Sequence, residues 1–140
     1  MCVCLSALHH LTASNARVVE TTKKANVLLV EDEPINAEMV GYMLQCMGHE
    51  VTVSYTGDDA IIRVSENAFD CVLLDINLPD INGLEVAKIM KEGHPDLPII
   101  ALTANAHRSD KEASLQAGIR YHLVKPVTFQ ELKNTLRLAL

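Results

Sequence analysis

The chain has 140 residues, of which 49% are hydrophobic and 21% are charged. This is the size of one ordinary domain, and the composition excludes disordered and collagen-like chains. No apolar run approaches the roughly 18 residues that a membrane-spanning helix needs. The formal net charge is −6, and because residues 1–25 carry three basic and one acidic side chain, residues 26–140 carry −8. Since an acidic surface repels phosphate backbones, we expect no nucleic-acid partner and no direct membrane contact.

A polar segment separates the start of the chain from the rest. Residues 12–25 are rich in Ser and Thr and lack a sustained hydrophobic period, which predicts a linker. We therefore divide the chain into an N-terminal tail over residues 1–25 and a single domain over residues 26–140.

The cysteines indicate a reducing environment. Cys2, Cys4, Cys46 and Cys71 do not have disulfide-framework spacing, and there is no signal peptide with a cleavage site. We expect a cytoplasmic location, within a parent chain that can itself be membrane-anchored. Cys2-x-Cys4 is short for a zinc site. Cys46 and Cys71 are interpreted as inert buried thiols.

Short apolar runs alternate with segments of helical period from residue 26 onward. The runs predict five strands, over residues 26–30, 51–55, 70–74, 97–102 and 119–124. Helix signals lie between and after them: Pro34 at a first helical position, Asn82 as an N-cap, and Thr128 with Glu131 as a capping box. This alternation predicts an α/β fold with a doubly wound parallel sheet, because right-handed crossovers leave few other topologies.

Acidic side chains follow the predicted strands at one edge of that sheet, where such sheets bind ligands. The first run ends in Glu31-Asp32-Glu33, the third in Asp75, the fourth in Thr103 and the fifth in Lys125. Neighbouring carboxylates are costly unless a cation or an ammonium group neutralises them. Asp32, Asp75 and a backbone carbonyl are hard oxygen ligands suited to Mg²⁺, and Lys125 adds an ammonium charge.

One reaction would use this set of groups. A carboxylate can attack a phosphoryl group and form an aspartyl phosphate, provided that metal and ammonium charges neutralise the phosphoryl oxygens. The Thr103 hydroxyl can donate a hydrogen bond to one of those oxygens. Each residue is individually common at a helix cap, a turn or a strand end, but their occurrence at successive strand ends favours the functional interpretation.

Four motifs, in this order, resemble the receiver domains of two-component signalling. They are V-L-L-V-E-D-E-P at 27–34, D-I-N-L-P-D-I-N-G at 75–83, A-L-T-A-N-A at 101–106 and V-K-P-V at 124–127. The resemblance covers residues 26–140. It implies a flavodoxin-like (CheY-like) sheet of five parallel strands in the order 2-1-3-4-5, with five helices.

The resemblance also assigns a role to each motif residue. The implied roles are phosphoacceptor for Asp75, ligands of Mg²⁺ (or Mn²⁺) for Glu31, Asp32, Asp75 and the backbone carbonyl of Asn77, and phosphoryl binding for Thr103 and Lys125. It further implies a cis peptide bond before Pro126, an isomer accessible mainly to X–Pro bonds.

The sequence departs from the family three residues before Lys125. The family usually carries a Tyr or Phe there that rotates on activation, whereas this chain has His122, with Tyr121 beside it. We interpret His122 as a half-exposed residue of an edge strand, with a partner-facing or pH-sensitive switch as the alternative. Ala104 and Asn105, which follow Thr103, lie where the family places switch and tuning residues.

Details of the motifs favour receivers that are fused to sensor histidine kinases. E-D-E-P-I-N, A-L-T-A-N-A and K-P-V resemble that subclass, and C-V-C-L at 2–5 resembles the final strand of a kinase ATP-binding domain. We therefore expect a histidine kinase domain as phosphodonor and a histidine phosphotransfer domain as acceptor. The alternative is a stand-alone response regulator that signals by protein–protein contact.

Other classes of protein share this fold or chemistry. A haloacid-dehalogenase-type phosphatase also forms an aspartyl phosphate, but it needs an acid two residues after the nucleophile, where this chain has Asn77. A nucleotide-binding module would need a Gly-rich turn after the first strand, where Glu31-Asp32-Glu33 would repel phosphate. A degenerate receiver that serves only for protein contacts is disfavoured by the intact set of Asp32, Asp75, Thr103 and Lys125.

Overall fold

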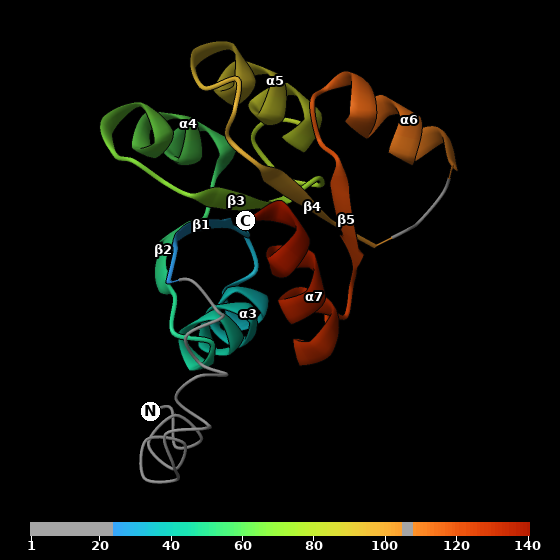
Figure 1. Ribbon diagram of the computed structural model, residues 1–140. Helices are drawn as coiled ribbons and strands as arrows, with labels where there is room; N and C mark the ends of the chain where they lie inside the picture. The colour runs from blue at the N-terminus through green and yellow to red at the C-terminus, as the bar shows by residue number, and fades with distance from the viewer. Residues whose placement is uncertain (1–23, 105–107) are drawn as a thin grey trace, which may run out of the picture.

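The computed structural model describes residues 24–104 and 108–140, in which five strands alternate with five helices (Figure 1). The elements are, in chain order, β1 (Asn26–Val30), α3 (Pro34–Cys46), β2 (Glu50–Ser54), α4 (Gly57–Glu66), β3 (Cys71–Asp75), α5 (Gly83–Gly93), β4 (Ile99–Thr103), α6 (Arg108–Gln116), β5 (Tyr121–Val124) and α7 (Phe129–Ala139). Most of the predicted tail, including Cys2 and Cys4, lies outside the described residues.

All five strands are parallel and pair in the order β2-β1-β3-β4-β5. This confirms the predicted doubly wound sheet and its strand order. Val30 pairs with Leu74, and Asp75 pairs with Leu102, so the carboxyl ends of β1, β3 and β4 lie side by side. Side chains that follow these ends are therefore brought to one edge of the sheet.

The core consists of two apolar layers, one on each face of the sheet. Helices α4, α5 and α6 cover one face, and α3 and α7 cover the other (Figure 1). Because side chains alternate along a strand, Leu28 and Leu74 pack in the layer of α4 and α5, whereas Leu29 and Leu73 pack in the layer of α3 and α7. All four are fully buried, which explains why the central strands are continuous apolar runs.

Several strand boundaries differ from the predicted ones by one or two residues. The strand predicted over 97–102 is found at Ile99–Thr103, because Pro98 has no N–H to contribute to a ladder. Asp75 and Thr103, predicted to follow strands, are instead the last residues of β3 and β4. The sheet therefore fixes their main chains directly.

The predicted helix caps are confirmed. The Asn82 side chain accepts a hydrogen bond from the Leu84 N–H at 2.8 Å, and Thr128 and Glu131 form a reciprocal capping box on α7. Pro34 is the first residue of α3. These local signals determine where α3, α5 and α7 begin.

The two cysteines in the described part of the chain are buried, as predicted. Cys71 lies on the central strand β3, and burial raises the pKa of its thiol to about 12. A thiol with so high a pKa is protonated and unreactive at neutral pH.

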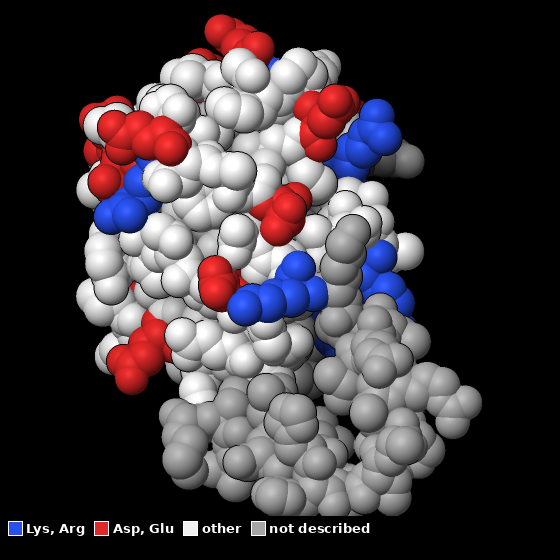
Figure 2. Space-filling model, turned by 60° about the vertical axis from the view of Figure 1, so that its left-hand side comes forward, with Lys and Arg blue, Asp and Glu red and all other residues white. Residues whose placement is uncertain are grey.

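Charged side chains of both signs are dispersed over the face that Figure 2 shows. On the face shown in Figure 2, Lys and Arg of the described residues stand beside Asp and Glu and do not gather into one basic patch. Among the helices of residues 24–104 and 108–140, none has the length and apolar character that crossing a membrane requires.

Gly83, the first residue of α5, lies directly against the end of β3. A Cβ atom at this position would lie 2.6 Å from the carbonyl oxygen of Asp75 and 2.6 Å from the Cα atom of Ile76. Both are backbone atoms, so they cannot move aside without displacing Asp75. Gly93 ends the same helix, and a Cβ atom there would meet nothing within 4 Å.

We expect Gly83→Ala to lower the free energy of unfolding by about 1–3 kcal/mol, the usual cost of overpacking. Gly93→Ala is the matched control, and it should change this free energy by less than about 1 kcal/mol. Urea unfolding followed by circular dichroism measures both. Equal stabilities of the two variants would contradict the close approach of α5 to β3.

His49, between α3 and β2, is a buried hydrogen-bond acceptor. Its exposed fraction is 5%, and its Nδ1 atom accepts the Ala25 N–H at 3.0 Å. Burial lowers the pKa of His49 below its ordinary value of 6.5, and the charge of Asp70 opposes this shift. The neutral ring therefore fastens the start of β1.

Because the pKa of His49 is lower in the folded chain, the unfolded chain takes up a proton there more readily. The stability that His49 contributes is thus present above pH 6.5 and is lost as the pH falls below that value. We expect His49→Asn, whose amide oxygen accepts the same hydrogen bond without titrating, to flatten the fall in unfolding free energy between about pH 7.5 and 5.5. An unchanged slope relative to wild type would refute this assignment.

Candidate functional site

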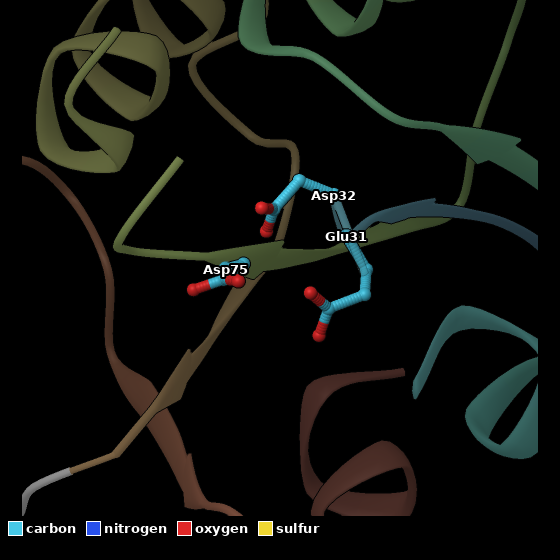
Figure 3. A group of neighbouring side chains, drawn as sticks. All are labelled: Glu31, Asp32 and Asp75. Carbon is cyan, nitrogen blue, oxygen red and sulfur yellow. The ribbon is translucent and has the colours of Figure 1, made fainter. Parts of the chain in front are cut away.

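Three carboxylates meet at the carboxyl edge of the sheet. Glu31 and Asp32 follow β1, Asp75 ends the neighbouring β3, and one oxygen of each lies within 4.8 Å of the others. Figure 3 shows the adjacent Glu31 and Asp32 side chains projecting in different directions from the chain. Glu31 and Asp75 are buried, at 1% and 3% exposure, whereas Asp32 is exposed. The site is therefore accessible from solvent on the Asp32 side.

The ammonium group of Lys125 contacts two of these acids. Its Nζ atom lies 2.8 Å from Glu31 Oε1 and donates a hydrogen bond to Asp75 Oδ2 at 3.0 Å. Lys125 follows β5, where its backbone N–H donates to the Thr103 carbonyl at 2.8 Å. The Lys125–Pro126 peptide bond is cis, as predicted. Lys125 thus balances part of the negative charge of the site.

The environment separates the pKa values of the two buried acids. Burial raises the pKa of Glu31, although the contact with Lys125 opposes this rise. Burial also acts to raise the pKa of Asp75, but hydrogen bonds from the Asn77 N–H and from Lys125 outweigh it, and the net shift is downward. The pKa of Lys125 is raised, because its two acidic partners more than offset the effect of burial. At neutral pH Asp75 is therefore a carboxylate, the form that acts as a nucleophile.

The loop after β3 orients the Asp75 side chain. The Asn77 N–H donates to Asp75 Oδ1 at 2.9 Å, so each carboxylate oxygen has its own donor. The Gly83 N–H donates to the Ile76 carbonyl at 2.9 Å, which brings the loop back to the strand end. The structure thus places Asn77 beside the acids.

The donor set suits a hard divalent cation. Oxygens around an octahedral Mg²⁺ lie 2.0–2.1 Å from the ion, so opposite oxygens are at most about 4.2 Å apart. The 4.8 Å span of the three carboxylates is slightly wider, and rotation of the exposed Asp32 side chain can close the difference. Carboxylates are ligands for Mg²⁺ and Mn²⁺, which keep waters in their other positions.

The remaining predicted residues lie at or near β4 and β5. Thr103 ends β4 and is half-buried, Ala104 is exposed, and Asn105 lies outside the described residues. His122 is half-buried on the edge strand β5, and its Nε2 atom is buried without a hydrogen bond to the described residues. Burial lowers the pKa of His122, and the positive charge of Lys111 lowers it further by a smaller amount. Its half-exposed position on an edge strand is as predicted, and a switching role stays a prediction.

One contact of the loop is not indicated by the sequence. Asp80 accepts the N–H groups of Gly57 and Asp58 at the start of α4, each at 3.0 Å. The hydrogen bond from the Gly57 N–H is the largest cause of the lowered pKa of Asp80, and the one from the Asp58 N–H lowers the pKa further. An Asp after Pro79 has the features of an ordinary turn residue, so no local signal could have linked it to a helix more than twenty positions away.

The sequence of the whole domain agrees with this geometry. The family model of the response regulator receiver domain matches residues 27–137, and the chain belongs to this family. The sensor histidine kinase RcsC of Salmonella typhi is 32% identical over 130 residues, which cover 93% of this chain and 14% of RcsC. The sensor protein EvgS of Escherichia coli K12 is 32% identical over 114 residues, which cover 81% of this chain and 10% of EvgS. The chain thus spans only a small part of these relatives.

This chain superposes on solved receiver structures over nearly the whole length of those structures. The receiver domain of the sensor histidine kinase PA1611 from Pseudomonas aeruginosa, solved with a magnesium ion coordinated in its active-site cleft, has a TM-score of 0.76 at 35% identity, with 83% of this chain and 97% of that chain covered. The chemotaxis protein CheY4 of Vibrio cholerae has a TM-score of 0.81 at 30% identity, with 84% and 100% covered. The predicted family and fold are confirmed.

Lys125→Met removes the ammonium group that lies between Glu31 and Asp75. Breaking a buried ion pair costs about 3–5 kcal/mol, and because the Lys125 side chain is 27% exposed, we expect a loss near the lower end at neutral pH. Without the ammonium group, burial raises the pKa values of Glu31 and Asp75 in the folded chain. Acids with raised pKa values in the folded chain stabilise it only at low pH, where they are protonated. The loss should therefore shrink as the pH falls toward about 5. Chemical unfolding with a chelator present, repeated across this pH range, measures it.

Lys24→Met is the matched control. Lys24 also pairs with a glutamate, Glu50, at 3.2 Å, but both side chains are about two-thirds exposed (67% and 65%), and such pairs contribute less than about 1 kcal/mol. A Lys125→Met protein as stable as Lys24→Met would mean that Lys125 does not neutralise the buried acids.

Proposed function

We propose that this chain is the phosphoacceptor receiver domain of a two-component phosphorelay, in which Asp75 accepts a phosphoryl group from a phosphohistidine. The observation that carries the proposal is the buried Asp75 carboxylate at a strand end, with hydrogen bonds from the Asn77 N–H at 2.9 Å and from Lys125 at 3.0 Å. In the proposed reaction a carboxylate oxygen of Asp75 forms a bond to phosphorus. The P–N bond of the donor breaks, and its electron pair returns to the imidazole ring.

Glu31, Asp32 and Asp75 would hold Mg²⁺ or Mn²⁺, together with the backbone carbonyl of Asn77. A cation in this place supplies neutralisation of charge on the phosphoryl oxygens. The 4.8 Å proximity of the three carboxylates supports this assignment, as does the magnesium ion in the related PA1611 receiver.

Thr103 at the end of β4 and Lys125 directly after β5 would complete phosphoryl binding. Lys125 supplies a positive charge, and the Thr103 hydroxyl donates a hydrogen bond to a phosphoryl oxygen. We assign the tuning of transfer and hydrolysis to Ala104 and Asn105, and a switching role to His122. The buried Nε2 atom of His122, which has no hydrogen-bond partner among the described residues, supports that last assignment.

The proposed donor and acceptor are a histidine kinase domain and a histidine phosphotransfer domain in the cytoplasm. Similarity to the sensor kinases RcsC and EvgS and to the PA1611 receiver supports an origin in a hybrid kinase. Similarity to CheY4 favours the alternative, a stand-alone response regulator. Transfer of phosphate from this chain to a purified histidine phosphotransfer domain favours the relay, and its absence with a panel of such domains favours the stand-alone regulator.

Intact-mass measurement tests acceptance of phosphate. With Mg²⁺ and a small acyl-phosphate donor, the wild-type chain should gain the mass of one phosphoryl group, and Asp75→Asn should gain none. Asp96→Asn, an exposed acid in the turn before β4, is the matched control and should behave as wild type. Release of phosphate over many turnovers without a trapped adduct would instead identify a phosphatase.

A further inference from the structure

Asp80 links the loop after β3 to a different part of the fold. Its Oδ1 atom accepts the Gly57 N–H and its Oδ2 atom accepts the Asp58 N–H, each at 3.0 Å. These amides belong to the first turn of α4, where N–H groups have no partner within the helix. The carboxylate therefore binds both donors at once across 22 and 23 positions of sequence.

The packing around Gly57 shows that the loop and α4 touch closely. A Cβ atom on Gly57 would overlap the side chain of Ile81, the residue after Asp80, and would lie 2.8 Å from Val86 Cγ2 on α5. There is no space for a side chain at this contact. The hydrogen bonds of Asp80 and the absence of a side chain at Gly57 are independent observations that fix the same junction.

The same loop carries the groups that orient the phosphoacceptor. At its start the Asn77 N–H binds Asp75 Oδ1, and at its end the Gly83 N–H binds the Ile76 carbonyl. Asp80 fastens the middle of the loop to α4. Movement of this junction would therefore move Asn77, whose N–H holds the Asp75 side chain.

Helix α4 does not depend on Asp80 for a cap. Thr56 is its N-cap residue, and the Thr56 hydroxyl oxygen accepts the Asp59 N–H at 3.1 Å. Loss of Asp80 would leave that cap in place. The distinct consequence of the Asp80 contact is therefore the position of the loop.

We infer that Asp80 is a positioning residue for the phosphoacceptor site, which holds Asn77 and Asp75 in the geometry that binds the divalent cation. This inference rests on the proposed function. Both Asp80 oxygens are bound to N–H groups of α4, so Asp80 acts on the site through the loop.

The test compares Asp80→Ala with Thr56→Ala by isothermal titration calorimetry with MgCl₂. Both variants remove a side-chain acceptor of N–H groups in the first turn of α4, and only Asp80→Ala releases the loop. We expect Asp80→Ala to bind Mg²⁺ about tenfold more weakly, the usual cost of losing an outer support of a metal site, and Thr56→Ala to bind as wild type. The rate of phosphorylation by an acyl phosphate, followed by intact mass, should fall in the same variant only.

Asp80→Asn is the second variant, for the case that Asp80→Ala does not fold. Its amide oxygen keeps one of the two hydrogen-bond acceptors and so preserves the fold. We expect Asp80→Asn to bind Mg²⁺ more weakly than Thr56→Ala. If Asp80→Ala also folds, Asp80→Asn should bind Mg²⁺ more tightly than Asp80→Ala. If either Asp80 variant matches Thr56→Ala, the positioning role is overturned while the proposed function stands. If the wild-type chain neither binds Mg²⁺ nor accepts phosphate, the proposed function fails and this inference fails with it.

Discussion

The site depends on neutralisation of carboxylates that water reaches poorly. Glu31 and Asp75 are almost completely buried, and two such acids cannot both be ionised at low cost without a nearby positive charge. Lys125 provides that charge from the end of β5, while its backbone N–H is bound to the end of β4. The charge balance therefore links β1, β3, β4 and β5, and the relative positions of these strands determine the chemistry of Asp75.

The parallel sheet supplies those positions. Its register aligns the carboxyl ends of β1, β3 and β4, and the apolar layers on both faces prevent the central strands from shifting. Since Asp75 belongs to the ladder, its main chain is as rigid as the core, and only its side chain needs local support. Asn77, Lys125 and the close approach of Gly83 provide this support. The parallel sheet thus both buries the apolar core and orients the Asp75 carboxylate.

The sequence predicts the parts of this arrangement that are local or periodic. Apolar runs identify the strands, caps identify Asn82 and Thr128, and polar residues at strand ends identify Asp75 and Lys125. Strand boundaries are less predictable, because hydrophobicity at residues 97–98 does not reveal where the ladder begins beside Pro98. Contacts between segments distant along the chain leave no local pattern. For that reason, neither the hydrogen bonds of Asp80 to α4 nor that of His49 to Ala25 could be predicted.

The contacts of Lys125 also bear on how a phosphorylated state would differ from this one. In the proposed reaction, negative charge would move outward from Asp75 to the phosphoryl oxygens, and the Lys125 ammonium group would follow that charge. The contact of Lys125 Nζ with Glu31 Oε1, at 2.8 Å, would keep the ammonium group within the site. Because the Lys125 N–H is bonded to the Thr103 carbonyl at 2.8 Å, displacement of Lys125 displaces the end of β4 with it. The segment between these two residues includes α6 and His122. We therefore propose that this segment is the part of the chain whose packing would change on phosphorylation.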